Sequence, residues 1–576
     1  MKISGAQIVI ECLVEQGVDT VFGYPGGAIL NIYDELYKNS SRIRHILTAH
    51  EQGASHAADG YARSTGKVGV VMATSGPGAT NLVTGIATAY MDSVPVVAIT
   101  CNVPTPLLGK DSFQEIDITG VTMPITKHNF MVRSVEELAR TIREAFVIAK
   151  SGRPGPVLID IPKEVTANQA EFTPISTGAP AKASGIEDES LRRILTVATP
   201  QDAEIEAAAS LINSAERPVI YAGGGIVIGQ AEAELRAFAE KADIPVAQSL
   251  MARAAFPSDH RLCMWMVGMH GTKASNMAVT ESDLVITLGA RFSDRVTSDA
   301  SKFASGSRIF QIDIDPAEIN KNIATCGALV GDIKQILLRL IPLIEKKNRS
   351  EWTGRVQSWM KEVPSCYSRE PKNSINPKFL CEYISKAAGE DTFITTEVGQ
   401  HQMWTAQFYP FTKPRTFITS GGLGTMGFGT GAAIGVQCAL PQARVVHIAG
   451  DGSFRMNCNE LATIQHYKLP IIIVVVNNGA LGNVRMWQRL FYGKRFSQTT
   501  LDFGPDWVKL AEAYGIKGYR AGTLSEFKKA FDAALASGAA AVIDAKVDID
   551  EMVLPMVPGG KPIYSMIMEL STEMMD

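Results

Sequence analysis

The sequence predicts an α/β protein in which three doubly wound parallel-sheet domains follow one another along the chain. Three observations support this prediction. The chain has 576 residues, which is too long for a single hydrophobic core and suits about three domains. Its apolar segments are short continuous runs rich in valine and isoleucine, which is typical of strands covered on both faces. Helical segments and glycine-rich turns separate these runs, and such alternation favours parallel sheets.

The bulk composition is that of an ordinary globular protein, with 46% hydrophobic residues, 20% charged residues and a net charge of −4. No block of basic residues occurs, so we expect no nucleic-acid partner. No apolar run approaches the ~20 residues that span a bilayer, and the N-terminus shows no signal-peptide core. We therefore expect no membrane insertion. The eight cysteines include no C-x-x-C pair, and a cytoplasmic, reducing location is the default.

In the first third of the chain, a helix is expected to begin at a capping box formed by Ser4 and Gln7 and to stop at Gly17. A short strand then precedes Glu51, which opens another helix. Further strands are expected within three apolar runs, at 67–73, 93–101 and 155–162. The first domain is therefore expected over residues 1–170.

The middle and last thirds repeat the same plan. Strands are expected within 217–226, 243–250, 282–290, 308–315, 391–399, 443–451, 470–478 and 540–548. Two breaks in composition, at 173–190 and 345–377, resemble linkers. We therefore expect the second and third domains over residues 188–345 and 372–560.

Residues 443–482 form one predicted strand–helix–strand unit, whose first strand ends at Asp451 and whose second ends at Asn478. A right-handed crossover puts both strand ends at the same edge of the sheet, where α/β proteins bind ligands. Carboxylate and amide oxygens suit Mg²⁺, which often keeps phosphate oxygens in its shell. Either residue alone would be an ordinary turn residue. Gly450 and Gly452 would let the backbone approach a phosphate.

The segment from Gly450 to Gly482 resembles the thiamine-diphosphate motif. This resemblance implies that Asp451, Asn478 and the main-chain oxygen of Ala480 bind the metal. Such a cofactor also needs a carboxylic acid at N1′ of its pyrimidine ring, ideally one with a raised pKa. The segment "HEQGASH" implies Glu51 for this role, although a glutamate there could merely favour the helix N-terminus.

Nearly the whole chain resembles the catalytic subunit of the acetohydroxyacid synthase family, also called acetolactate synthases. The motifs are "FGYPGGAILNIYD", "TSGPGATN", "SGRPGPVLIDIPK", "LGARFSDRV", "IDIDPAEINKN", "GQHQMW", "GGLGTMGFG" and "RMWQRLFY". The resemblance implies a pyrimidine-binding, a central flavin-binding and a diphosphate-binding domain, in that order. It also implies that pyruvate is decarboxylated and that its hydroxyethyl unit is joined to a second 2-oxo acid, pyruvate or 2-oxobutyrate, in branched-chain amino-acid biosynthesis.

Further site residues follow from this resemblance. Arg295 is implied as the receptor of the second substrate's carboxylate, because a guanidinium binds carboxylates in a fork, although it could instead pair with Asp294. Trp487 is implied to favour 2-oxobutyrate, although it could equally fill a core. Gly27 and Gln114 are implied beside the reacting carbon.

The cofactors implied are thiamine diphosphate, Mg²⁺ and an FAD with no redox role. Met426 is implied as a wedge between the two thiamine rings, although it could be an ordinary core methionine. The thiamine diphosphate positions are Glu51, Gly76, Asn81, Val398, Gly399, Gln400, His401, Gly424, Met426, Gly450, Asp451, Gly452, Ser453 and Asn478. The FAD positions are Gly224, Gly225, Ser249, Leu250, Met251, Gly289, Arg291, Asp313, Glu318, Ile319 and Asp332. The glycine spacing is not G-x-G-x-x-G, so FAD depends on the resemblance alone.

The chain departs from the family pattern at several places. Ala252, Arg253 and Ala254 replace a usual Gly-Leu-Gly, and we expect a different loop because glycine allows backbone shapes that other residues resist. Asn483 stands where a methionine is usual. Competing interpretations are a pyruvate oxidase with a redox-active flavin, a catabolic acetolactate synthase without flavin, and a non-catalytic cofactor-binding paralogue. The family's site lies between two chains, which implies a homodimer or homotetramer and allows a regulatory small subunit.

Overall fold

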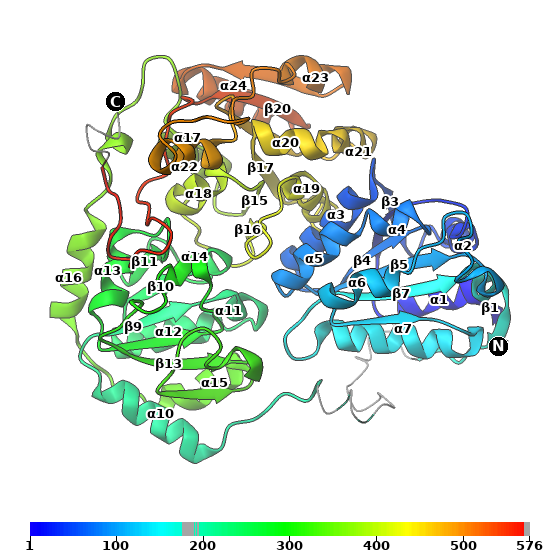
Figure 1. The fold of residues 1–576 in the computed structure, drawn as a ribbon, viewed down its shortest axis with the longest axis horizontal. Coiled ribbons are helices and arrows are strands. Elements are labelled where there is room, and N and C mark those ends of the chain that lie inside the picture. The colour runs from blue at the N-terminus through cyan, green and yellow to red at the C-terminus, as the bar shows by residue number, and fades with distance from the viewer. Residues whose placement is uncertain (176–188, 190–191, 193–194, 570–576) are drawn as a thin grey trace.

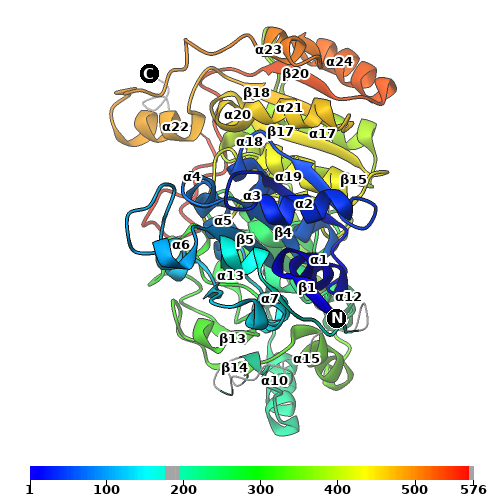
Figure 2. The same cartoon turned by 90° about the vertical axis from the view of Figure 1, so that its right-hand side faces the viewer.

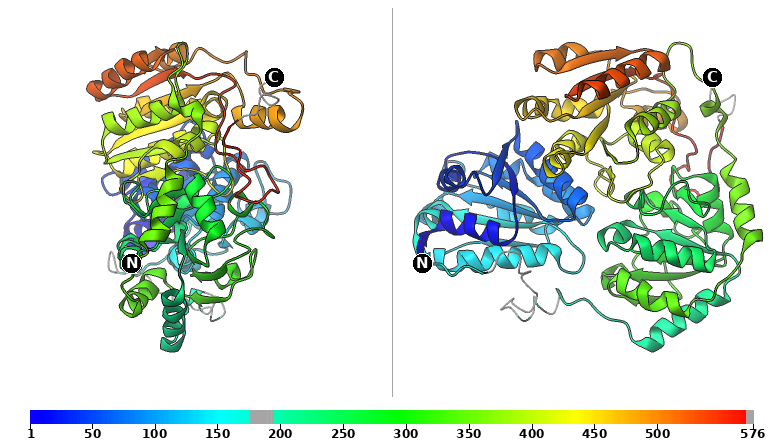
Figure 3. Two further views of the ribbon diagram at one scale, coloured as in Figure 1. Left: turned by 90° about the vertical axis from the view of Figure 1, so that its left-hand side faces the viewer. Right: turned by 180° about the vertical axis from the view of Figure 1, so that it is seen from behind.

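The computed structural model describes residues 1–175, 189, 192 and 195–569. Its described part contains three six-stranded sheets and one two-stranded sheet. Every pair of neighbouring strands in the large sheets is parallel. Figure 1 shows the three resulting domains in separate colour ranges, blue to cyan, green, and yellow to red. Helices flank each sheet, as Figure 2 and Figure 3 show from other sides. The predicted fold class is confirmed.

The N-terminal sheet has the strand order β3 (Arg44–Leu47), β2 (Thr20–Tyr24), β4 (Gly69–Ala73), β5 (Val96–Asn102), β7 (Val157–Pro162), β6 (His128–Met131). Its helices are α1 (Gly5–Glu15), α2 (Leu30–Lys38), α3 (Glu51–Thr65), α4 (Pro77–Thr80), α5 (Val83–Met91), α6 (Ile118–Thr122), α7 (Val135–Lys150) and α8 (Lys163–Ala167). The strands β1 (Lys2–Ser4) and β8 (Gln169–Glu171) pair antiparallel beside it. The capping box of Ser4 and Gln7 is present at the start of α1, as predicted.

The middle sheet has the order β11 (Cys263–Met266), β10 (Val246–Gln248), β9 (Pro218–Ala222), β12 (Leu284–Leu288), β13 (Arg308–Asp313), β14 (Gly327–Val330). Its helices are α10 (Asp202–Ser214), α11 (Gly224–Ile228), α12 (Glu232–Ala242), α13 (Lys273–Glu281), α14 (Asp294–Thr297) and α15 (Ile333–Leu340). Strand order reverses direction beside β9, the kind of switch point where α/β sheets bind ligands.

The C-terminal sheet has the order β16 (Phe417–Ile418), β15 (Thr392–Thr396), β17 (Arg444–Gly450), β18 (Ile472–Asn477), β20 (Ala541–Lys546), β19 (Lys517–Ala521). Its helices are α17 (Pro377–Ala388), α18 (Gln400–Phe408), α19 (Phe428–Ala439), α20 (Asp451–Asn457), α21 (Leu461–His466), α22 (Gly482–Phe491), α23 (Trp507–Ala513) and α24 (Leu524–Ser537). Helix α22 stands out from this domain in Figure 2.

One predicted linker is wrong for its central part. Within 345–377, the helix α16 (Ser350–Met360) packs on the middle domain, and Trp352 is buried with Val356 in a core cluster that includes Val279. These apolar residues lie one helical turn apart, a spacing that the surrounding charges obscured. The other predicted linker, 173–190, lies largely outside the described residues.

The N- and C-terminal domains share one hydrophobic core. Helix α3 packs against α19, and alanines from both helices belong to a single buried cluster. Glycines allow this approach, because a Cβ on Gly435 would meet the Ala57 carbonyl oxygen at 1.9 Å. Within the described residues, no helix is both long and apolar enough to cross a lipid bilayer.

Candidate functional site

A cavity of about 610 Å³ lies between the middle and C-terminal domains, with one wall from the N-terminal domain. This volume is typical of a cofactor pocket. Ten of the eleven residues predicted for FAD line it: Gly224, Gly225, Ser249, Leu250, Met251, Gly289, Arg291, Asp313, Glu318 and Asp332. Ile319 does not line the cavity, although its neighbour Glu318 does. These ten residues come from five separate segments of the middle domain.

Close backbone packing shapes the middle-domain wall. Gly289 has a φ of +57°, and a Cβ on Gly225 would meet its Cα at 2.7 Å. Burial raises the pKa of Asp313, at the end of β13, to about 6, so a hydrogen-bond donor on a ligand would stabilise its charged form. Glycines and an acidic group at the ends of adjacent strands suit a dinucleotide. The residues present thus fit an FAD.

The same cavity also holds residues predicted for thiamine chemistry. Val398 and Gly424 line it from the C-terminal domain, and Arg295 and Trp487 line it from α14 and α22. The side chain of Arg295 is 63% exposed, and its ion pair with Asp294 is long, at 3.9 Å. An arginine held so loosely is available to a carboxylate ligand.

Asn483 lines this cavity one helical turn before Trp487. Its Oδ1 atom is buried and has no hydrogen-bond partner among the described residues. The departure at this position therefore places an amide in the part of the cavity that also contains Trp487.

The loop after β10 has a glycine-type backbone conformation at Ala254, although glycine is absent from 252–254. Ala254 adopts a φ of +78°, a conformation that glycine would adopt without strain. Arg253 is buried and packs over the ring of Trp265, with its guanidinium carbon 4.7 Å from the ring centroid. It donates hydrogen bonds to the carbonyl oxygens of Ala406 and Tyr409 at the end of α18. No carboxylate of the described chain pairs with it, and burial lowers its pKa to about 10.

The strands β17 and β18 are adjacent and parallel, with Gly450 opposite Val476. Asp451 and Asn478 therefore lie at the same edge of the sheet, as the crossover predicts. Burial raises the pKa of Asp451 to about 6, against hydrogen bonds from backbone N–H groups that include that of Asn478. A cation at this carboxylate would offset the desolvation.

Other groups converge on this edge. The Ala480 carbonyl oxygen lies 3.9 Å from where a Cβ of Gly452 would stand. Asn478 donates from Nδ2 to Gln400 Oε1 at 3.0 Å, which leaves its own oxygen directed at the Ala480 N–H. In the part of the chain that the structure describes, no three His, Cys, Asp or Glu side chains are grouped to hold a metal. A cation here would thus rely on mixed carboxylate, amide, backbone and ligand oxygens, which suits Mg²⁺.

His401 contributes an unsatisfied polar atom beside the same edge. Its ring lies against Gly450, where a Cβ would meet Nδ1 at 2.6 Å. The Nε2 atom is buried and has no hydrogen-bond partner within the described part of the chain, and burial lowers the pKa of the ring to about 3. A neutral imidazole with one free nitrogen fits a diphosphate oxygen. Gly399, Gly450, Gly452 and Ser453 surround this position in the chain, at the starts of α18 and α20.

A second group of predicted residues gathers in the N-terminal domain. Asn81 Nδ2 donates to Glu51 Oε2 at 3.0 Å, and a Cβ on Gly76 would touch the backbone of Gln114 at 2.9 Å. Gly27 has open space around its Cα. None of these five residues lines the 610 Å³ cavity. Within one chain, the structure thus separates the Glu51 group from that cavity.

Sequence reasoning missed Glu397, which is fully buried at the end of β15. Its carboxylate accepts hydrogen bonds from the N–H groups of Gly427 at 2.6 Å, Gly429 at 3.1 Å and Thr430 at 3.2 Å, the first turn of α19. It therefore fixes the backbone directly after Met426. Only its position before Val398 in the sequence could have indicated this role.

Comparisons with known proteins agree with this arrangement. Sequence models of the thiamine pyrophosphate enzyme family match residues 3–121 as the N-terminal TPP binding domain, 205–340 as the central domain and 397–545 as the C-terminal TPP binding domain. A probable acetolactate synthase large subunit of Methanocaldococcus jannaschii is 47% identical, covering 99% of this chain and 96% of its own. This chain belongs to the acetolactate synthase family of thiamine pyrophosphate enzymes.

Two further relatives span distant organisms. An acetolactate synthase of Mycobacterium bovis is 46% identical over 97% of this chain and 90% of its own. An acetolactate synthase large subunit of Porphyra purpurea is 44% identical over 98% of this chain and 95% of its own. The match to the N-terminal TPP binding domain contains the Glu51 group, and the match to the C-terminal one contains Asp451 and Asn478. The two groups thus fall in the two domains named for binding this cofactor.

Proposed function

We propose that this protein is a thiamine-diphosphate-dependent acetolactate synthase of branched-chain amino-acid biosynthesis. It decarboxylates pyruvate and joins the remaining two-carbon unit to pyruvate or 2-oxobutyrate. The observation that carries the proposal is that Arg295 and Trp487 line the same cavity as Val398 and Gly424. A cavity in which predicted cofactor-binding residues lie together with a predicted carboxylate receptor, Arg295, suits the joining of two 2-oxo acids. The names of the relatives support the same activity.

The cofactor end of the proposal assigns the edge of β17 and β18 to Mg²⁺ and the diphosphate. Asp451, Asn478 and the Ala480 carbonyl would hold the cation, and the free nitrogen of His401 would face a phosphate oxygen. When bound, thiamine diphosphate supplies the carbon nucleophile for the keto group and the electron sink for decarboxylation. Glu51 would hold a proton at N1′ of the pyrimidine ring, which favours the form of that ring that acts as a base.

Glu51 can serve that role only if a second copy of the chain completes the site, so we propose a homodimer or homotetramer. The Glu51 group lies away from its own chain's cavity. Exposed apolar side chains lie near two of its members in the chain: Tyr24, three residues before Gly27, is 41% exposed, and Phe113, next to Gln114, is 88% exposed. Side chains of this kind mark an interaction surface. The partner's C-terminal domain would cover this surface.

The middle-domain residues of the cavity would hold FAD as a structural group. The Arg295 guanidinium would bind the acceptor carboxylate, and Trp487 would contact its alkyl group. One added methylene, which distinguishes 2-oxobutyrate from pyruvate, is worth about 0.8 kcal/mol when fully buried, so a large aromatic wall can bias the choice. We further propose a cytoplasmic location, and a regulatory small subunit as partner, since relatives are named large subunits.

The decisive experiment supplies the purified protein with thiamine diphosphate, Mg²⁺ and ¹³C-labelled pyruvate, each with and without FAD and with and without 2-oxobutyrate. We expect acetolactate, or 2-aceto-2-hydroxybutyrate, with no electron acceptor consumed. A pyruvate oxidase would instead reduce the flavin, a catabolic synthase would work without FAD, and a non-catalytic paralogue would give no product. Any of these three results would overturn the proposal.

A further inference from the structure

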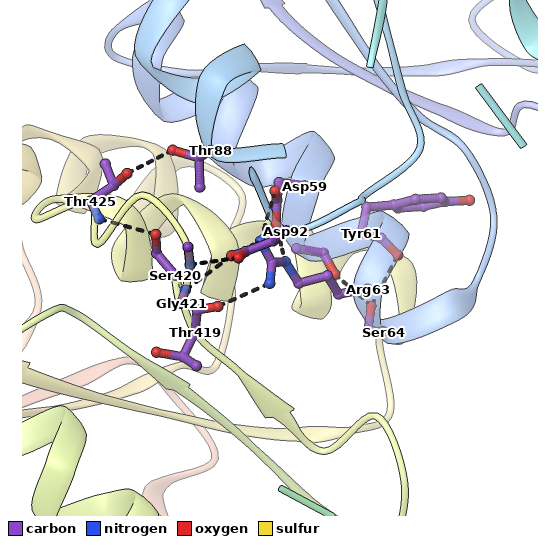
Figure 4. Close-up of polar contacts among 12 residues, drawn as sticks. Asp59, Tyr61, Arg63, Ser64, Thr88, Asp92, Thr419, Ser420, Gly421 and Thr425 are labelled. Atoms are coloured by element: carbon purple, nitrogen blue, oxygen red, sulfur yellow. Dashed lines mark hydrogen bonds and ion pairs between the residues drawn. The ribbon is translucent and has the colours of Figure 1, made fainter. Parts of the chain in front are cut away.

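Asp92 lies where the N-terminal domain meets the loop that precedes Met426. It follows α5, lines the 610 Å³ cavity and has a side chain with 0% exposure. Its two carboxylate oxygens accept the N–H groups of Gly421 at 3.0 Å and Gly422 at 2.7 Å. Figure 4 shows the carboxylate directed at this loop from the opposite domain. We call residues 419–426 the cavity loop.

A buried charge group stands behind Asp92. Arg63, in the last turn of α3, donates to Asp92 Oδ2 at 3.0 Å, to both oxygens of Asp59, and to the Thr419 carbonyl at 2.9 Å (Figure 4). Burial alone would lower the pKa of Arg63, but the two carboxylates outweigh burial and raise it. Two carboxylates share this one guanidinium. The excess negative charge is therefore stabilised by the backbone N–H groups of the cavity loop, as in anion-binding backbone concavities.

The cavity loop packs closely against the end of α5. A Cβ on Gly422 would meet Asp92 Oδ1 and the Met91 carbonyl oxygen, each at 2.9 Å. One residue before Met426, the hydroxyl of Thr425 lies 2.7 Å from that of Thr88 on α5, and both are buried. The loop is thus held by α5 at two places, and Met426 comes directly after the second.

We propose that Asp92, itself held by Arg63, is a positioning residue that fixes the cavity loop and thereby Met426. The N-terminal domain then has two tasks in the assembled enzyme. Its Glu51 group serves the site it shares with a second chain, and its Asp92 shapes the cavity of its own chain. The effect on catalysis rests on the proposed function, whereas the effect on the loop does not.

The test compares Asp92→Asn with Glu15→Gln in the full chain. The control is closely matched, because Glu15 is 5% exposed, pairs with Arg143 through two hydrogen bonds and accepts the Ile175 N–H, yet has no contact with the cavity loop. Hydrogen–deuterium exchange of the cofactor-free protein measures the loop directly. We expect peptides covering 419–426 to exchange at least about tenfold faster in D92N and at the wild-type rate in E15Q.

A kinetic split provides the second readout. The Asp92 carboxylate bonds Arg63, Gly421 and Gly422 rather than a group of the Asp451 edge, so the KM for thiamine diphosphate should stay within about threefold in D92N while kcat falls about tenfold or more. Should D92N fail to fold, Thr88→Val carries the test, since it removes the hydroxyl link to Thr425, together with one hydrogen bond to the Thr84 carbonyl within α5, and should raise exchange in the same peptides. The proposal is overturned if peptides covering 419–426 exchange at the wild-type rate in D92N. It is also overturned if E15Q shows the same faster exchange or the same fall in kcat as D92N. If the wild type makes no acetolactate, the exchange result still decides the role of Asp92.

Discussion

Replacing Glu397 by glutamine should destabilise the C-terminal domain and slow catalysis together. The carboxylate accepts three backbone N–H groups and the Thr430 hydroxyl at the first turn of α19. A glutamine keeps the shape of the side chain but replaces one acceptor oxygen by an NH₂ donor. That donor would face either the Gly427 N–H or the N–H groups of Gly429 and Thr430. An unsatisfied buried donor costs about 1–3 kcal/mol.

The lost charge adds to this loss. An anion at a helix N-terminus contributes about 0.3–2 kcal/mol, and hydrogen bonds to a charged acceptor are roughly twice as strong as neutral ones. Together these effects predict a loss of about 1–5 kcal/mol. For a domain of this size, the middle of that range corresponds to a melting temperature lowered by roughly 10 °C.

Differential scanning calorimetry is the suitable assay, because a chain of several domains need not melt in one step. The matched control is Glu526→Gln in the same domain, whose carboxylate accepts the N–H groups of Gly522 and Thr523 at the surface; it should shift the melting temperature by less than about 3 °C. A transition of E397Q within 2 °C of the wild type, with full kcat, would show that Glu397 does not hold the start of α19.

Four further outcomes follow from the site. Glu51→Gln should abolish acetolactate formation while leaving the melting temperature within about 2 °C, and retained activity would contradict its role. Removal of divalent cations should abolish activity, and Mg²⁺ should restore it in the wild type but far less in Asp451→Ala, as titration of initial rates would show. Arg295→Gln should raise the acceptor KM at least about tenfold with little change in stability, because its side chain is 63% exposed; an unchanged KM would exclude it as the carboxylate receptor. Arg253→Met should stabilise the protein by about 1–2 kcal/mol. In the folded protein, the pKa of Arg253 lies below its usual value, at about 10. Its positive charge therefore lowers the free energy of unfolding at every pH below that value. An R253M variant that is less stable than the wild type would contradict this reasoning.

The central strands of all three sheets could be predicted from the sequence, and most of the edge strands could not. The runs around β5, β12 and β18 are continuous and apolar because helices cover both faces. The strands not predicted at the edges are β6, β11, β14, β16 and β19. They are short, and β6, β14 and β19 also carry polar or glycine residues, as in "KGYRA". An edge strand is specified by the neighbour that it pairs with. The interior strand β2 was also missed, because Gly23 interrupts its apolar run.

Some residues of the candidate site could likewise be predicted from local sequence, and others could not. The Asp451–Asn478 edge follows from one local strand–helix–strand unit, so sequence spacing and the crossover rule suffice. The roles of Arg295 and Trp487 depended on family resemblance, because they come from different domains and only the fold brings them to one cavity. The separation of Glu51 from that cavity was expected from the same resemblance. Its hydrogen bond with Asn81 joins residues 30 positions apart, a pairing that no periodicity indicates.

Asp92 and Glu397 show what local patterns cannot reveal. In the sequence Asp92 is a polar residue between a helix and a strand, and Glu397 is a polar residue after a strand, both of which are ordinary positions. In the structure one carboxylate binds the start of the cavity loop and the other binds the backbone just beyond its end, from opposite domains. A loop of glycines has no side chains with which to fix itself, so its conformation must be imposed by acceptors elsewhere. Buried carboxylates suit this task, since each can accept several N–H groups at once.

Combining D92N with E397Q therefore tests one physical idea at both ends of the same loop. If the loop moves as a unit, the increase in 419–426 exchange in the double variant should exceed the sum of the increases in the two single variants. Simple additivity would show that each end is held separately.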